Sequence, residues 1–460
     1  MKDVYEYFRN ESEYGDFDLD GACVRLSEAV KCKSVSDCED PAPFFAIHEL
    51  IKKSFPNIMA AGTFEAVGRS VLITVPGSDP SLKPALFMSH IDVVPVVEGT
   101  EKDWTYDAYS GAIAEGCIWG RGTQDIKVQV FAELEAMEYL LAKGGKLKRT
   151  VYLAFGQDEE TFNTGAQAIS DLLKSRGVTL EFLLDEGGSG MKDGAVYGAP
   201  GCTIASINLM EKGYADLKLT VRSKGGHSSR PFGGTSLERL SRAITKVCDH
   251  PFPPTVCTTL KGTFNALKPY VTAEPLRTIL ADPDKNEAKL AEYCLNDKDL
   301  FPFVITTIAP TMISGSSAAP NVMPQNMSAV INFRLAAGMD PEKLMAHCRS
   351  VIDDDSVELE FLQANAASAE ARCDGYGYAK LAEAMEHYYG GVVFVPSITT
   401  GGTDAHCYEQ ICDTCLRCGP FMIPEGEQGA HGTNEKMRIR SFAQGIRVLI
   451  RLMEGTCFSA

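Results

Sequence analysis

The sequence has 460 residues, more than one hydrophobic core usually supports, so it predicts two domains. Acidic residues outnumber basic ones by 61 to 44, and the formal charge of -17 argues against nucleic acid as a partner, because that binding needs clustered Lys and Arg. The polar first twenty residues do not resemble a signal peptide, and no later apolar run is long enough for a membrane helix. We therefore expect no membrane partner and a cytoplasmic location.

The fifteen cysteines are odd in number and irregularly spaced, which indicates free thiols rather than a secreted disulfide framework. Cys412, Cys415 and Cys418 have the spacing of part of an iron-sulfur ligand run, but a fourth cysteine is missing. Because the surrounding segment has the pattern of a strand, packing is the favoured role and a redox function a distant alternative.

Three apolar runs in the first half predict strands at Leu86–Ser89, Val151–Phe155 and Phe182–Leu184. Between the first two, apolar residues at spacings of three and four predict a helix from Ile126 to Ala142. This alternation predicts an α/β domain with a mostly parallel sheet that helices cover on both faces.

After about residue 210 the pattern changes to half-exposed strands with alternating polar and apolar residues. The predicted order of elements is β-α-β-β-α-β, which is that of a ferredoxin-like α+β unit. Its strands lie at 217–221, 303–308, 327–333 and 357–361, and its helices at 237–247 and 341–352.

The α/β pattern returns with a helix at 381–389, a strand at 392–395 and a last helix at about 435–453. We therefore predict a discontinuous catalytic domain of residues 1–210 and 372–460. Residues 211–371 would form an inserted domain that serves as a lid or a dimer contact.

Carboxylates follow each of the three predicted strands of the first half, and a histidine also follows the first of them. Ligands of open parallel sheets bind at the edge where strands end, so these side chains are expected to meet there. Each group alone has an ordinary alternative, such as a solvated acidic turn. The residues are His90 with Asp92, Asp158 to Glu160, and Asp185 with Glu186.

Two further candidates lie in loops, Asp125 just before a helix and His431 before the last helix. Asp125 could instead be a helix N-cap, and His431 a solvent-exposed loop residue. Taken together, two histidines and three carboxylates suit zinc better than calcium or magnesium, which prefer oxygen ligands alone. Five such residues can hold two metals if one carboxylate bridges them.

Eight short motifs in one order resemble the dinuclear-zinc metallopeptidases that include glutamate carboxypeptidase, aminoacylase, Gly-X carboxypeptidase and succinyl-diaminopimelate desuccinylase. The motifs are SHIDVVP at 89–95, GRGTQDIK at 120–127, DEE at 158–160, LDEGG at 184–188, GGHSSRP at 225–231, NVMPQ at 321–325, GGTDA at 401–405 and HGTNE at 431–435. The resemblance spans nearly the whole chain. It implies an amide hydrolase with two zinc ions per chain, for which cobalt or manganese could substitute.

By this resemblance, one zinc takes His90, Asp125 and Asp185, and the other takes Asp125, Glu160 and His431. Asp125 then bridges the two metals. Asp92 would orient His90, and Glu159 would act as general base on the water between the metals. Glu186 remains an alternative to Asp185, since the strand register decides which carboxylate points inward.

The resemblance also implies that His227 reaches the substrate carbonyl, often in the site of a partner subunit, and that a homodimer forms. Asn321 and Arg334 would grip the substrate carboxylate; without the resemblance, a turn Asn and a surface Arg are the simpler interpretation. The chain departs from the family pattern at Ile126, where an aspartate is common, and at TFNTGAQ after DEE, where glycines are common.

The expected function is release of an amino acid from a small peptide or N-acyl amino acid, as in carboxypeptidases and aminoacylases. A dipeptidase with the same metal centre is the nearest alternative. A non-catalytic binding protein that retains the fold is another, although the complete set of ligands and Glu159 argues against it.

Overall fold

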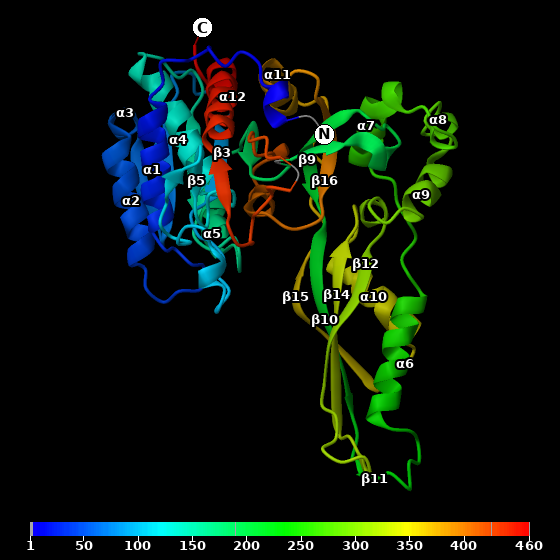
Figure 1. Cartoon of the computed structure of the whole chain (residues 1–460). Helices are drawn as coiled ribbons and strands as arrows, with labels where there is room; N and C mark the ends of the chain where they lie inside the picture. Colours follow the sequence, from blue (N-terminus) through cyan, green and yellow to red (C-terminus); the bar gives the residue numbers. More distant parts are fainter. Residues whose placement is uncertain (1–2, 189, 425, 460) are drawn as a thin grey trace.

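The computed structural model describes residues 3–188, 190–424 and 426–459. Figure 1 shows two parts, a broad part with helices around a large sheet and a narrow, elongated part around a small sheet. No helix in these ranges combines the length and the apolar character needed to cross a membrane.

The large sheet is mostly parallel at its centre and antiparallel at one edge, which confirms the predicted α/β class. Its order is β1-β2-β6-β3-β7-β17-β9-β16, with β8 paired to β9. The bounds are β1 Thr63–Val67, β2 Ser70–Val75, β3 Ala85–His90, β6 Val151–Gly156, β7 Phe182–Asp185, β8 Met191–Asp193, β9 Thr203–Glu211, β16 Val393–Thr399 and β17 Cys415–Arg417.

Helices cover both faces of this sheet, so its central strands are buried on both sides. On one face, α4 packs against β3 and is itself covered by α1 and α12, which explains why it is buried around most of its circumference. The other face carries α5 and the 3-10 helix η6. The bounds are α1 Leu19–Lys31, α2 Ala42–Ser54, α3 Pro56–Ala61, α4 Lys127–Ala142, α5 Thr164–Ser175, η6 Asp404–Tyr408, α11 Tyr376–Tyr388 and α12 Ile439–Cys457.

The last helix begins four residues later than predicted, because a short strand, β18 (Lys436–Arg438), precedes it. This strand pairs with β5 (Cys117–Trp119), which in turn pairs with β4 (Ile113–Ala114). The pairing brings Glu435 beside the loop before α4, a contact that helical periodicity could not reveal.

The small sheet is antiparallel throughout, in the order β12-β14-β10-β15, with α6 and α10 packed on one face. This arrangement matches the predicted ferredoxin-like order. The bounds are β10 Gly213–Arg222, α6 Ser236–Asp249, β12 Thr307–Ser314, β14 Asn326–Leu335, α10 Pro341–Ile352 and β15 Val357–Asn365. The second strand starts at Thr307 rather than Phe303, because Phe301–Phe303 form a 3-10 helix, η5.

A helical segment within the predicted insert, with α7 (Thr258–Leu267), α8 (Leu276–Ile279) and α9 (Glu287–Leu295), packs with the large sheet instead of the small one. Its buried side chains share a core with β9 and β16. By packing, the middle of the range 211–371 therefore belongs with the large sheet. Lys212, the single residue between β9 and β10, donates from Nζ to the carbonyls of Pro302 and Ile305.

All fifteen cysteines are free. Cys412, Cys415 and Cys418 are buried, Cys415 lies on β17, and none of them belongs to a candidate metal-binding group within the described residues. Their place in the core agrees with the packing role favoured above.

Candidate metal centre

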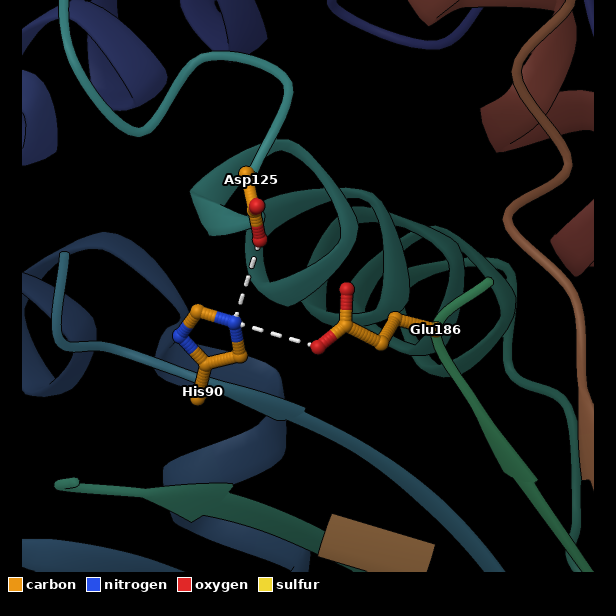
Figure 2. A group of neighbouring side chains, drawn as sticks. All are labelled: His90, Asp125 and Glu186. Atoms are coloured by element: carbon orange, nitrogen blue, oxygen red, sulfur yellow. Dashed lines mark ion pairs between the residues drawn. The ribbon is translucent and has the colours of Figure 1, made fainter. Parts of the chain in front are cut away.

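The site lies where β3, β6 and β7 end, and it is built around the buried side chain of His90. The Nε2 atom of His90 lies 3.3 Å from Asp125 Oδ1 and 3.1 Å from Glu186 Oε1. Figure 2 shows all three side chains converging from separate segments. This buried Nε2 has no hydrogen-bond partner of good geometry within the described residues, as expected where an imidazole faces a cation position.

A second group of three shares Asp125 with the first. The Nε2 atom of His431 lies 3.0 Å from Asp125 Oδ2 and 3.0 Å from Glu160 Oε2. In each group the donor atoms all lie within 4.8 Å of one another. Two ligands of one tetrahedral zinc, at bond lengths of about 2.0–2.1 Å, lie roughly 3.3 Å apart, so this spacing fits the metal.

The protonation of these groups also indicates a cation. Burial, reinforced by Asp125 and Asp185, raises the pKa of Glu186 to about 7. Hydrogen bonds to Asp125 and Glu160 raise the pKa of His431 to about 10. Protons thus compensate the clustered carboxylates in the metal-free protein, and metal binding would displace them.

The structure differs from the favoured sequence assignment at one ligand. Asp185, the last residue of β7, accepts hydrogen bonds from the backbone N–H groups of Ala405 (2.8 Å) and Glu186 (2.8 Å). It lies on the face of the sheet covered by η6, whereas Glu186, the first residue past the strand, turns over the sheet edge toward His90. Glu186 therefore takes the place given to Asp185, which was the alternative left open above.

Asp92 is fully buried and holds two parts of the site together. Its Oδ1 atom lies 3.3 Å from His90 Nδ1, as expected for a carboxylate that orients a metal-bound imidazole. Its two oxygens also accept from the backbone N–H groups of Glu159 and Glu160, each at 3.2 Å. The turn carrying these carboxylates is thereby fixed relative to His90.

Glu159 lies beside the metal ligands without belonging to either group. Its Oε2 atom is 4.0 Å from His90 Nε2. Burial, with Glu186 adding to it, raises the pKa of Glu159 well above its usual range. A buried carboxylate whose pKa is raised is suited to accept and release a proton. Asp158, the first residue of the turn, instead accepts from Gly165 N at the start of α5.

Glu435 supports Asp125 and was not singled out from the sequence as a separate functional residue. It is completely buried, and Oε1 accepts from Asp125 N (3.2 Å) and Gln124 N (2.7 Å). Its other oxygen accepts from Arg121 Nη1 at 2.6 Å. The loop that presents the shared ligand is thus held by one carboxylate, for which the HGTNE motif was the available signal.

Asp404 was also missed, although it stands in the GGTDA motif. It is buried, accepts from Asn163 Nδ2 at 2.9 Å, and has one oxygen without a partner in the described part of the chain. Burial raises its pKa well above the usual range, with Asp185 adding to the effect. Asp404 thus belongs to the same cluster of carboxylates as Glu159 and Asp185.

The structure does not bring His227 and Asn321 to the metal centre of the same chain. His227 and Asn321 lie at the far tip of the small sheet, where β11 (Gly226–His227) pairs with β13 (Val322–Met323) and Ser228 N bonds to Asn321 O at 2.9 Å. Figure 1 shows β11 at the end of the molecule farthest from the large sheet.

Arg334 lies near the opposite end of β14, with its guanidinium 4.7 Å from the centre of the Tyr214 ring. Asn321 and Arg334 are separated by most of an extended strand, which spans roughly 3.3 Å per residue. Asn321 and Arg334 of one chain therefore do not meet at one carboxylate, and their shared role in substrate binding stays a prediction.

Comparison with known proteins agrees with this geometry. The family model described as peptidase family M20/M25/M40 matches residues 86–455. This chain belongs to that family. It is accordingly an enzyme that hydrolyses amide bonds and uses a metal cofactor.

Relatives cover nearly the whole chain. Human N-fatty-acyl-amino acid synthase/hydrolase PM20D1 is 31% identical over 93% of this chain and 86% of its own length. Probable carboxypeptidase S-like 2 of Dictyostelium discoideum is 30% identical over 94% and 84%.

Solved structures share the fold. An M20 family metallo-carboxypeptidase from Sulfolobus solfataricus has a TM-score of 0.67 at 17% identity, with 94% of this chain and 98% of that chain covered. Human carnosine dipeptidase 1 has a TM-score of 0.60 at 16% identity, with coverages of 96% and 97%.

Proposed function

We propose that the chain holds two zinc ions and uses them to release an amino acid from a small peptide or an N-acyl amino acid. The observation that carries this proposal is the pair of three-donor groups that share Asp125. His90 and Glu186 would complete one metal site, and Glu160 and His431 the other. When bound, the metal pair would supply Lewis acidity and would lower the pKa of a water molecule, so that hydroxide is available to attack an amide near neutral pH.

The residues of the chain then handle the proton. Glu159, which lies beside both groups, would accept a proton from the attacking water and deliver it to the leaving nitrogen. Asp92 would keep His90 in one orientation throughout the reaction, because it holds the Nδ1 side of the ring. Asp92 is fully buried and the Glu159 side chain is only 13% exposed, so few solvent molecules compete for these contacts.

Substrate binding would need a second copy of the chain. Since His227 and Asn321 lie at the tip of the small sheet, we propose that a homodimer brings them to the metal centre of the partner. Arg334 would then bind the substrate carboxylate from within its own chain, because a guanidinium pairs with a carboxylate through two parallel hydrogen bonds. Met312 and Ile313, exposed on the edge strand β12, are candidates for the dimer contact.

The nature of the acyl group separates the candidate activities. The names of the relatives include both an N-fatty-acyl-amino acid hydrolase and carboxypeptidases, which favour hydrolysis of an amide next to a free amino acid carboxylate. A dipeptidase would additionally need a free amino group on the substrate. A binding protein that retains the fold would bind these amides without cleaving them.

A panel of N-acyl amino acids and dipeptides, given to the zinc-loaded protein, tests this proposal. We expect release of free amino acid from at least one class, abolished by a chelator and restored by zinc. Cleavage of dipeptides alone, lost on N-acetylation, would establish the dipeptidase alternative. Tight binding of these amides with no turnover would overturn the proposed activity on them. The cytoplasmic location stays a proposal that a tagged copy in its own cell would test.

A further inference from the structure

A buried lysine lies at the junction between the two parts of the molecule. Lys212 is 3% exposed, and its Nζ atom donates to the carbonyl oxygens of Pro302 and Ile305, each at 2.7 Å. Figure 1 shows β10 running from this junction into the narrow part. An ammonium group has three N–H donors and a neutral amine has two, so these two acceptors would satisfy the neutral form completely.

The surroundings of Lys212 do not compensate a positive charge. Residues 301–307, which supply its acceptors, and residues 365–367, beside the start of β10, are all uncharged. The neighbouring Glu211 turns instead to Arg417, with Oε2 and Nε 2.7 Å apart. Within the described residues, no carboxylate forms an ion pair with the ammonium group of Lys212. Burial of a charge without a partner is unfavourable, so the neutral form gains population.

A second cation, Arg334, lies beside Lys212. On β14, Arg334 is paired with Tyr214 of β10 and with Thr307 of β12. Lys212 lies two residues before Tyr214, and its acceptor Ile305 lies two residues before Thr307. Diagonal neighbours of this kind are about 7–8 Å apart, which long side chains can span. The two positive groups are therefore close enough to repel each other.

The guanidinium of Arg334 remains available to an anion. It lies 4.7 Å from the centre of the Tyr214 ring, and no ion pair is recorded for it in the described part of the chain. Asp216, the next acidic residue along β10, accepts from Tyr214 Oη at 2.7 Å and from Asn332 Nδ2 at 2.9 Å. Neutral groups thus occupy this carboxylate.

The protonation of Lys212 follows from these contacts. Burial, with the charge of Arg334 adding to it, lowers the pKa of Lys212 to about 7. Its neutral and charged forms are then both populated near neutral pH. An anion bound to Arg334 would offset the repulsion and favour the charged form, and by linkage the charged form would favour binding of the anion.

We propose that Lys212 takes up a proton from solvent when the carboxylate of a substrate binds to Arg334. This inference rests on the carboxylate binding proposed for Arg334. The added charge would strengthen binding through the electrostatic field while the Lys212 side chain stays bonded to the segment before β12. Lys212 would thus act through Arg334, as a positioning residue, and would make binding weaker as the pH rises.

Titration calorimetry near pH 8, in buffers that differ in ionisation enthalpy, counts the protons taken up on binding. The protein is zinc-loaded Glu159→Gln, which prevents turnover. The ligand is the panel member that wild type hydrolyses best, or N-acetyl-methionine if wild type hydrolyses none. If the carboxylate raises the pKa of Lys212 by about one unit, the protonated fraction rises from about 0.1 to about 0.5, so we expect uptake of about 0.4 protons per ligand. The same shift makes binding about 10-fold weaker at high pH than at low pH.

Variants in the same background assign this proton to Lys212. Lys212→Arg, which stays charged, should bind as tightly at high pH as at low pH and take up about 0.4 fewer protons. Lys212→Met, which is never charged, should show the same loss of uptake and weak binding at every pH. Lys218→Met is the matched control, because Lys218 lies on the same strand and pairs with Glu360 at 3.0 Å. It should keep the uptake of the parent protein. Zinc content and melting temperature show that each variant is folded.

The outcomes separate this inference from the proposed function. Uptake that is unchanged in both Lys212 variants, or absent from the parent protein, overturns the inference. If wild type hydrolyses no amide but N-acetyl-methionine binds with uptake that depends on Lys212, the proposed function fails and the proton linkage stands. Hydrolysis without such uptake gives the reverse result. If neither hydrolysis nor binding occurs, both proposals are wrong.

Discussion

Glu186 Oε1 lies 3.1 Å from His90 Nε2, on the side of the imidazole that faces Asp125. The neighbouring Asp185 carboxylate instead accepts hydrogen bonds from two backbone N–H groups at the end of its strand. This contact distinguishes two adjacent carboxylates that the sequence could not separate.

Metal content should follow this distinction. Glu186→Gln is expected to lose about half of the bound zinc, because one of the two metal sites lacks a ligand, whereas Asp185→Asn should keep nearly all of it. Elemental analysis after mild dialysis measures both. Zinc loss in Asp185→Asn but not in Glu186→Gln would restore the first assignment.

Glu159 and Glu160 are expected to differ in the same assay and in kinetics. Glu159→Gln should retain both metals while kcat falls about 10²–10⁴-fold, the usual contribution of general acid-base catalysis. Glu160→Gln should lose metal and regain part of its activity with excess zinc. If the two phenotypes are exchanged, the assignment of ligand and base within this turn is reversed.

Arg334→Ala should raise KM about 10–100-fold for substrates with a free α-carboxylate, since hydrogen bonds to charged groups contribute about 1.5–3 kcal/mol. Amidated analogues should be affected little. Arg222→Ala is a matched control, because Arg222 is exposed on the same sheet and pairs with Glu358. Equal KM changes for both kinds of substrate would mean that Arg334 stabilises the sheet instead.

His227 offers a test of the dimer by complementation. Glu159→Gln and His227→Ala should each be nearly inactive, but an equal mixture that exchanges subunits should recover roughly a quarter of wild-type activity, from one intact site in each mixed dimer. Size-exclusion chromatography with light scattering establishes the oligomeric state. A monomer that is fully active would contradict the shared site.

A buried ion pair between Arg417 and Glu211 predicts an effect on stability. Arg417 Nε lies 2.7 Å from Glu211 Oε2, and both side chains are inaccessible to solvent. Arg417→Met should lower the free energy of unfolding by about 3 kcal/mol, because it leaves the buried Glu211 with His406 as its remaining cationic partner. Adding Glu211→Gln should restore part of that loss, which chemical denaturation would measure.

The same pair predicts a dependence on pH. Burial raises the pKa of Glu211, but Arg417 and His406 outweigh it and hold the pKa below the ordinary 4.5. A carboxyl whose pKa is lowered on folding contributes stability above about pH 4.5, and that stability is lost as the pH falls through the folded value. The loss of stability below this pH should be smaller in Glu211→Gln than in wild type.

The sequence predicted the features that depend on local pattern. Strand periodicity located the sheet edge where His90 and Glu160 stand, and the family resemblance joined Asp125 and His431 to them from two loops; the structure brings these four side chains together. Features decided by tertiary contacts were not accessible to it. Glu186 replaces Asp185 as the ligand because His90 lies beside Glu186, whereas the backbone of η6 lies beside Asp185. Likewise, the packing of α7 on β16 could not be inferred from local pattern.

The junction between the two parts limits how they can move. The chain passes between the two cores at four places, near residues 211–214, 253–255, 305–307 and 365–366, and Lys212 ties the first of these to the third. A joint of several cross-linked segments bends stiffly, so only small rotations are expected of it. The ten residues of β10 form a lever arm of about 33 Å beyond this joint. A tilt of only about 10° would therefore carry the tip of the lever through about 6 Å, by the same strand rise.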